Sequence, residues 1–363
     1  MKNTFGNNVS VTLFGESHGK GIGAVIDGLA AGIKVDTDFI KSQLNLRRPS
    51  GQISTSRREE DPFIIYSGVY NGYTTGTPIC IVIPNEDTKS EDYSENRFKA
   101  RPSHADFTAF SKYHGFEDFR GGGHFSGRVT AALVAAGAIV ISALREKGIY
   151  IGTHISRCAG IDDIPFKTYE EDIETLNKKE FAVLDSLKEA EMKEKILEAK
   201  ENGDSVGGIL ETAVIGMPCG IGEPWFDTVE GVLSHAIFSI PAIKGIEFGA
   251  GFELSDMKGS EANDAFRVKN SKIVTETNNN GGINGGISNG MPIVFRCVVK
   301  PTPTILKTQN TVDFNSMENT ELLSKGRHDP CIVHRARVVV DSVTAIVLCD
   351  MLSGRFGTDW QVK

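Results

Sequence analysis

The sequence lacks paired cysteines, a secretion signal and a long apolar run. Its six cysteines, at positions 80, 158, 219, 297, 331 and 349, include no C-x-x-C pair. The sequence therefore suggests neither a zinc site nor a disulfide framework, and we expect a reducing cytoplasmic location. The N-terminus has no basic-then-apolar signal pattern, and the most apolar segment, 131–144, is shorter than the roughly 20 residues that span a bilayer. We predict a buried helix there and no membrane partner.

Positive charge is also in short supply. Lysine and arginine number 39 against 47 aspartates and glutamates, a formal net charge of -8. This balance argues against a nucleic-acid partner, although a local basic pocket would still bind a phosphorylated small molecule. At 40% apolar residues the chain can bury a large core as a soluble globular protein. No linker, low-complexity run or repeat of fixed period divides it, so we expect a single domain over 1–363.

Hydrophobic and β-branched patterns predict a mixture of strands and long helices. The predicted strands are 9–14, 62–69, 79–83, 209–215, 293–299 and 338–340, and the predicted helices are 36–46, 104–113, 126–145, 181–201, 229–240 and 341–351. Asn71-Gly72 separates two strand-like runs, which is typical of a tight antiparallel hairpin. The pattern favours an α+β fold.

The first glycine cluster is open to two interpretations. Gly19, Gly21 and Ala24 follow a strand-like run and match G-x-G-x-x-G/A, as in an NAD(P)-dependent oxidoreductase. A dinucleotide fold alternates strands and helices regularly, however, whereas this chain continues with a helix, a basic loop and strands typical of antiparallel pairing. The alternative is a loop that presents Ser17 and His18 to a substrate, or simply a structural histidine.

Three further clusters carry groups that bind anions or move protons. The guanidinium group of arginine matches the geometry of phosphate and carboxylate oxygens. Glycines before a helix allow an anion to approach the backbone closely. A residue that precedes proline, such as Asp329, is biased away from helical geometry and is expected in a loop. The clusters are Arg47, Arg48, Arg57 and Arg58; Arg101 and His104 with the glycines 121–123, Ser126, Arg128 and Thr130; and Lys325, Arg327, His328 and Asp329. Each has a plain alternative: a solvated loop balanced by Glu59, Glu60 and Asp61, an ordinary glycine turn, and a salt-bridged surface turn.

Taken in order, these segments resemble the chorismate synthase family over nearly the whole chain. The motifs run from "FGESHG" through "TTGTPI", "RPSHADF", "RGGG", "VAAGAI", "GDSVGG", "GGISNG" and "KPT" to "GRHDPC". The resemblance implies an α+β sandwich of long central helices between antiparallel β-sheets, assembled as a homotetramer. It also implies that the dinucleotide-like spacing of Gly19, Gly21 and Ala24 is a coincidence.

The resemblance implies a carbon–oxygen lyase that uses reduced FMN, without net redox change. Its substrate is 5-enolpyruvylshikimate 3-phosphate, which loses phosphate and a ring proton to give chorismate, the last common step of aromatic amino acid biosynthesis. His18 would protonate or stabilise the leaving phosphate with Ser17 beside it. His104 would act at the N1 region of the flavin, and Asp329 would assist removal of the ring proton, directly or through flavin N5. Arg47, Arg48, Arg101 and Arg128 would bind the substrate anions.

The family's flavin positions also carry over, with some departures from the common pattern. They fall on His124, Phe125, Ser126, Pro241, Ala242, Gly285, Lys300, Pro301, Thr302, Pro303, Thr304 and Arg327. His124 and Phe125 replace a usual Arg and Ser, and Pro241 replaces a frequent Asn. Some members reduce their own flavin with NADPH, but we expect dependence on a separate source of reduced flavin. The alternative is a flavin- or phosphate-binding protein on this scaffold without turnover.

Overall fold

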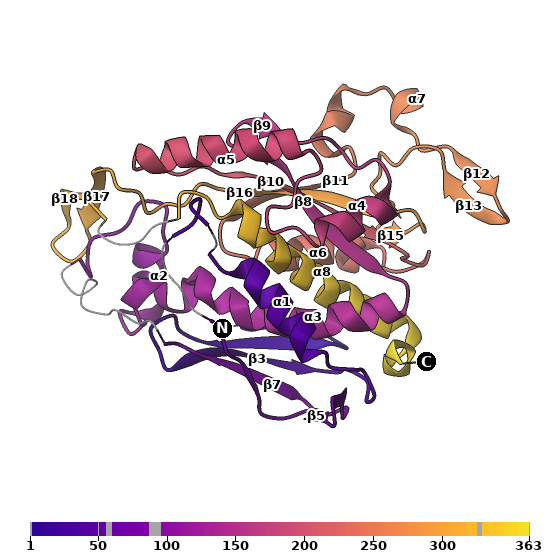
Figure 1. The fold of residues 1–363 in the computed structure, drawn as a ribbon, viewed down its shortest axis with the longest axis horizontal. Helices are drawn as coiled ribbons and strands as arrows, with labels where there is room; N and C mark the ends of the chain where they lie inside the picture. Colours follow the sequence, from indigo (N-terminus) through magenta and orange to yellow (C-terminus); the bar gives the residue numbers. More distant parts are fainter. Residues whose placement is uncertain (1, 50, 56–59, 87–95, 325–328, 363) are drawn as a thin grey trace.

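Two antiparallel sheets enclose the long helices of this protein (Figure 1). The structure is a computed structural model that describes residues 2–49, 51–55, 60–86, 96–324 and 329–362. One sheet has the order β1 (Thr4–Phe5), β2 (Ser10–Gly15), β3 (Gly21–Asp27), β7 (Ile79–Pro84) and β4 (Ile64–Ile65). The other has the order β11 (Ile243–Phe248), β16 (Ile293–Val299), β10 (Gly208–Ile215), β8 (Tyr150–Cys158) and β9 (Ile161–Asp162).

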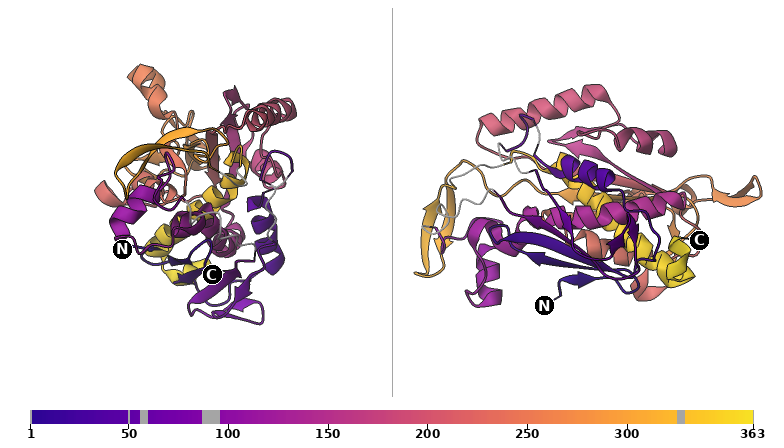
Figure 2. Two further views of the ribbon diagram at one scale, coloured as in Figure 1. Left: turned by 90° about the vertical axis from the view of Figure 1, so that its left-hand side faces the viewer. Right: turned by 60° about the horizontal axis from the view of Figure 1, so that its bottom comes forward.

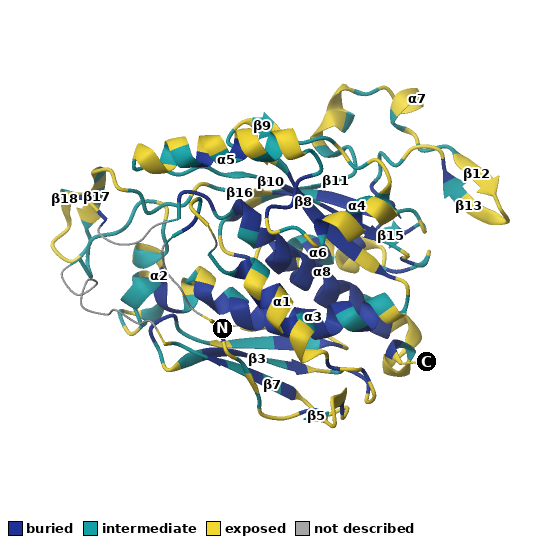
Figure 3. Cartoon of the chain, in the orientation of Figure 1, coloured by how far each residue is buried: buried dark blue, intermediate teal, exposed yellow. Residues whose placement is uncertain are grey.

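Helices α3 (Thr130–Glu146) and α8 (Val333–Phe356) form the layer between the sheets (Figures 1 and 2). Helix α3 packs against β3 and β7, while α8 packs against β8 and β10. The two helices meet closely at Gly137, where an added Cβ would lie 2.4 Å from the Cβ of Ser342. Figure 3 shows both helices almost entirely buried. The α+β sandwich expected from the resemblance is therefore confirmed.

Helix α3 explains the most apolar part of the sequence. The helical segment Gly127–Glu146 is 20 residues long and apolar enough to cross a membrane by length and composition. It is therefore longer than the apolar segment 131–144 that was expected from the sequence to be too short for this. However, 83% of an 18-residue apolar window within this segment is buried inside the protein. A helix that is apolar on all sides fits a position between two sheets, which agrees with the predicted buried helix.

Shorter elements surround these layers. They are α1 (Thr37–Arg47), β5 (Val69–Tyr70), β6 (Tyr73–Thr74), α2 (Asp106–Tyr113), α4 (Tyr169–Leu176), α5 (Ser186–Glu201), α6 (Val229–Ile237), α7 (Gly259–Ala262), β12 (Phe266–Lys269), β13 (Lys272–Thr275), β14 (Ile283–Asn284), β15 (Ile287–Ser288), β17 (Gln309–Asp313) and β18 (Glu318–Leu322). Figure 1 shows β12–β13 projecting at one end and β17–β18 beside α2 at the other. The predicted Asn-Gly hairpin is confirmed, because Asn71 and Gly72 join β5 to β6 with φ of 50° and 78°.

Two local predictions were wrong. The predicted strand 338–340 lies inside α8, where its three valines are buried against the surrounding layers, so burial in the central layer outweighs their strand preference. The predicted strand 62–69 is reduced to the two-residue β4 and the start of β5. The dinucleotide interpretation is also excluded, since Gly21 and Ala24 lie in β3, which pairs with β2 as an antiparallel hairpin rather than starting a helix.

A buried histidine ties the second sheet to the chain that follows it. His154 of β8 lies between two carboxylates, with Nδ1 2.9 Å from Asp163 Oδ2 and Nε2 2.9 Å from Glu211 Oε2. Burial by itself would lower the pKa of His154, but the hydrogen bonds to Asp163 and Glu211 raise it above its ordinary value. The contacts of His154 with Asp163 and Glu211, which we call the His154 clamp, are therefore strongest when the ring is protonated.

This clamp predicts a pH-dependent contribution to stability. Because the folded pKa is raised, the contribution is complete below the ordinary histidine value of about 6.5 and is lost as pH rises through the higher folded value. We expect His154→Gln to lower the free energy of unfolding more at about pH 6 than at about pH 9. Urea denaturation of both proteins at the two pH values measures the difference. An equal loss at both would show that the charged form of the ring is not what stabilises the fold.

Candidate active site

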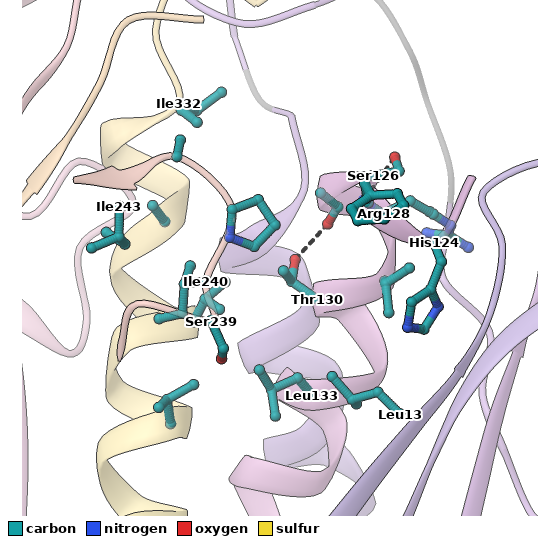
Figure 4. A pocket seen from close by; sticks show the side chains of 18 of the residues that line it. Leu13, His124, Ser126, Arg128, Thr130, Leu133, Ser239, Ile240, Ile243 and Ile332 are labelled. Atoms are coloured by element: carbon teal, nitrogen blue, oxygen red, sulfur yellow. Dashed lines mark hydrogen bonds between the residues drawn. The ribbon is translucent and has the colours of Figure 1, made fainter. Parts of the chain in front are cut away.

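A cavity of about 800 Å³ opens between α3 and α8. Figure 4 shows side chains from both sides pointing into it, with Ile240, Ile243 and Ile332 facing Thr130 and Leu133. Its wall also includes a set of charged or titratable residues, namely Lys2, Arg47, Arg48, Asp61, His104, His124, Arg128, His235, Lys244, Lys300, Asp329 and Arg335. A large cavity with an apolar wall and convergent polar groups is typical of a small-molecule site.

Three arginines converge on one buried carboxylate. Asp61, with a side chain only 1% exposed, contacts Arg128 through Oδ1. Its Oδ2 lies 3.5 Å from Arg47 Nη1 and 3.8 Å from Arg48 Nε. Among the described residues, three guanidinium groups surround this one carboxylate, and such a gathering of positive charge favours binding of further anions. Asp61 thus balances these arginines as a buried carboxylate, and not within the solvated loop that was the alternative for this cluster.

The three arginines differ in the hydrogen bonds that their guanidinium groups already make within the protein. Arg47 donates to the Gly127 carbonyl at 2.8 Å and to Thr130 Oγ1 at 3.0 Å. Arg128 donates from Nε to Asn85 Oδ1 at 3.0 Å. Arg48 is more exposed, and its Nε is buried without a hydrogen-bond partner among the residues that the structure describes. Arg48 is thus better placed than Arg47 or Arg128 to donate to a bound anion.

Asp329 is held in the loop that precedes α8. Its Oδ1 accepts a hydrogen bond from the Thr55 backbone N–H at 3.0 Å, and its Oδ2 pairs with Arg335. The Asp329 side chain is 12% exposed and lines the cavity. These contacts fix the carboxylate in a loop, as the following proline predicted. Residues 325–328, which include the predicted Arg327, lie outside the described residues.

His104 reaches the cavity wall from the turn that precedes α2. Its Nδ1 lies 2.8 Å from Asp106 Oδ1. Arg101 binds the same carboxylate with Nε 2.8 Å from Oδ2 and Nη2 2.7 Å from Oδ1. Although burial would raise the pKa of Asp106, the hydrogen bonds from Arg101 and His104 hold it well below its ordinary range. Arg101 is not among the described residues that line the cavity; it faces Asp106 instead.

Ser17 and His18 lie next to the glycine turn 121–123. Ser17 Oγ lies 3.1 Å from His18 Nδ1 and 3.2 Å from the Arg120 carbonyl, to which it donates. All three glycines have φ between 52° and 90°, a region in which other residues are strained. A Cβ on Gly121 would lie 2.0 Å from His18 Cε1, and one on Gly122 would lie 3.2 Å from His104 Cε1. The glycines therefore let both histidine rings pack against one turn.

Most of the predicted flavin positions fall on the cavity wall. These are His124, Phe125, Ser126, Pro241, Ala242, Lys300, Thr302, Pro303 and Thr304. Within the described part of the chain, Pro301 and Gly285 do not line it, and Gly285 is exposed in the turn between β14 and β15. His124 Nδ1 donates to the Gly15 carbonyl at 2.8 Å, which fixes the ring beside the cavity.

The wall chemistry fits a flat aromatic ring that carries a phosphate. Leu133, Val339 and Val343 provide apolar surface. Four buried polar atoms on wall residues have no hydrogen-bond partner among the described residues, namely Arg48 Nε, Thr55 Oγ1, Thr302 Oγ1 and Arg335 Nε. Burial and the positive charge of Lys244 lower the pKa of Lys300, as expected where cations gather around an anion site.

Sequence reasoning missed three residues of this site as functional candidates: Asp61, Asp106 and Arg335. Asp106 was detectable in principle, because it lies two residues after His104 in "RPSHADF". Asp61 was noted only as a charge that balances the arginines. Arg335 carries no local signal, since it lies on the first turn of α8 and approaches Asp329 only because the helix begins there.

The fold and the cavity define a class: an α+β protein with an arginine-rich cavity bordered by histidine and carboxylate side chains. A profile of the family described as "Chorismate synthase" matches residues 9–353. Chorismate synthase of Dehalococcoides mccartyi is 46% identical over 352 residues, covering 97% of this chain and 96% of its own. That of Thermococcus gammatolerans is 45% identical, covering 96% and 97%. A crystal structure of chorismate synthase matches with a TM-score of 0.77 and 31% identity, covering 97% of this chain and 94% of the other. The chain belongs to the chorismate synthase family.

Proposed function

We propose that this protein removes phosphate and a ring proton from 5-enolpyruvylshikimate 3-phosphate to give chorismate, as a carbon–oxygen lyase. The observation that carries the proposal is that one cavity is lined by the arginine cluster around Asp61 together with His104 and Asp329. The substrate has a phosphate and two carboxylates, and guanidinium groups bind such oxygens in a fixed geometry. The family membership of the chain supports the same reaction.

The residues divide into anion-binding and proton-transferring groups. Arg48 and Arg335 line the cavity, and the Nε of each is buried without a hydrogen-bond partner among the described residues. We therefore assign them to the substrate anions, with Arg47 and Arg128 holding the cluster in place. His18, supported by Ser17, would protonate or stabilise the leaving phosphate. His104 and Asp329 would hold and move protons at the flavin side and at the ring carbon. Arg101, whose guanidinium group pairs with Asp106, would act on the site only indirectly, by fixing the carboxylate that contacts His104.

The proposed cofactor is reduced FMN. When bound, it would supply transient electron density to the allylic system of the substrate while phosphate leaves. His124, Phe125, Ser126, Pro241 and Ala242 would contact it from one part of the wall, and Lys300, Thr302, Pro303 and Thr304 from another. Phe125, whose ring is 6.0 Å from that of Tyr113, offers an aromatic face to a flat ring.

We also propose the domain organisation, location, oligomeric state and flavin supply of the protein. We expect one domain over 1–363, a cytoplasmic homotetramer, and a separate source of reduced flavin rather than an intrinsic NADPH-dependent reductase. Size-exclusion chromatography with light scattering measures the oligomer. Assays with NADPH and oxidised FMN, without dithionite, measure any intrinsic reductase activity.

Anaerobic phosphate release tests the proposed reaction. With dithionite-reduced FMN, the wild-type protein should release phosphate from 5-enolpyruvylshikimate 3-phosphate, and chorismate should appear in equal amount. We expect His104→Ala and Asp329→Ala to lower the rate more than tenfold, because each removes a group that moves a proton. Tight flavin binding by the wild type without phosphate release would instead support the alternative of a binding protein without turnover.

A further inference from the structure

The turn before α2 presents one carboxylate to two functional side chains. Asp106 is the first residue of α2, and the N-cap Ala105 offers no side chain to the helix. Ser103 has a φ of 59°, a left-handed conformation that costs energy for a residue with a Cβ. The chain thus makes a tight turn that brings residues 101 and 104 back to the same carboxylate.

Both oxygens of Asp106 are fully used. Oδ1 accepts from His104 Nδ1 at 2.8 Å and from Arg101 Nη2 at 2.7 Å. Oδ2 accepts from Arg101 Nε at 2.8 Å and from the Arg101 backbone N–H at 2.9 Å. A carboxylate that accepts four hydrogen bonds, two of them from a guanidinium fork, has a fixed position and stays ionised.

The opposite edge of the His104 ring faces the glycine turn. A Cβ built on Gly122 would lie 3.2 Å from His104 Cε1 and 3.4 Å from Nε2. His104 also lines the cavity, whereas Arg101 and Asp106 do not appear among the described residues of its wall. An ionised carboxylate accepts only, so in the neutral ring the hydrogen must be on Nδ1.

We infer that Asp106 is a positioning residue for His104, which it holds as the Nδ1–H tautomer with Nε2 as the atom available for proton transfer. Arg101 in turn fixes Asp106, so the three residues form one unit in which only His104 meets the ligand. This inference rests on the proposed function for its kinetic consequence, although the tautomer itself does not depend on it.

Asp106→Asn tests the kinetic consequence. The asparagine side chain keeps the shape of aspartate but has only one oxygen. If that oxygen accepts from His104 Nδ1, the amide hydrogens face the donors of the Arg101 guanidinium group. We expect kcat for anaerobic phosphate release to fall by about 10- to 100-fold, the range seen when the partner that orients a metal-ligating histidine is lost. KM for the substrate should change less than threefold, because the anion-binding arginines are unaltered. Asp162→Asn is the matched control, since it removes a carboxylate paired with Arg157 at 2.7 Å on the β8–β9 edge. It should leave kcat unchanged.

The tautomer can be measured without relying on the variant. In protein labelled with ¹⁵N-histidine, the His104 signals, assigned by their loss in His104→Gln, should show a protonated Nδ1 and an unprotonated Nε2 when the ring is neutral. Asp106→Asn should shift this pattern toward protonated Nε2. A wild-type ring protonated on Nε2, or an unchanged kcat in a folded Asp106→Asn protein, would overturn the inference. Absence of phosphate release by the wild type would count against the proposed function alone, because the ¹⁵N measurement still tests the tautomer.

Discussion

Replacement of Gly121 by alanine should lower the rate of phosphate release by about 100-fold or more. The added Cβ would lie 2.0 Å from Cε1 and 2.2 Å from Nδ1 of His18, and 2.9 Å from Ser17 Oγ. Gly121 also has a φ of 58°, which alanine adopts only with strain. The His18 ring or the turn must therefore move, and a displacement of about 1 Å at a reacting group costs on the order of 100-fold.

The measurement is anaerobic phosphate release at saturating substrate, with a thermal melt to confirm that the variant is folded. Gly259→Ala is the control, because a Cβ at Gly259 meets no heavy atom within 4 Å and its φ is not left-handed. That variant should keep the wild-type rate. A folded Gly121→Ala protein with nearly wild-type activity would mean that the position of His18 against this turn does not matter for the reaction.

Neutralising Asp61 should destabilise the protein by about 3 kcal/mol or more. The Asp61 side chain is 1% exposed, and its partners Arg128 and Arg47 are only 4% and 8% exposed. Asp61→Asn removes the negative charge that these two buried guanidinium groups share. Asparagine is the appropriate replacement, because residue 61 has a φ of 48°, which asparagine tolerates better than most residues.

Urea denaturation of wild type and Asp61→Asn measures this loss, and added inorganic phosphate should restore more stability to the variant than to the wild type. The control is again Asp162→Asn, whose ion pair with Arg157 is 63% and 46% exposed at its two side chains. We expect that control to cost less than about 1 kcal/mol. A loss of the same small size at Asp61 would show that the arginines do not depend on its charge.

Local sequence patterns were reliable where the governing contacts are local. Asn71-Gly72 specified its hairpin because the turn needs φ above zero at both positions, and the apolar run within α3 specified a buried helix. The valines 338–340 misled for the opposite reason, since their environment is set by the two sheets around α8 rather than by neighbouring residues. Strand β8, which carries His154, was not predicted at all.

The sequence by itself determined which chemical groups are present: the histidines, the arginine pair at 47 and 48, Asp329 and the glycine turn, in an order that identifies the family. Only the tertiary structure decided how these groups are used. It places Asp61, which is 67 residues from Arg128 in the chain, under that side chain, and it turns Arg101 toward Asp106 instead of toward the cavity. The physical reason is that the orientation and charge state of an ionisable side chain depend on the nearest opposite charge in space. The packing of segments that are distant in the chain sets the distance to that charge.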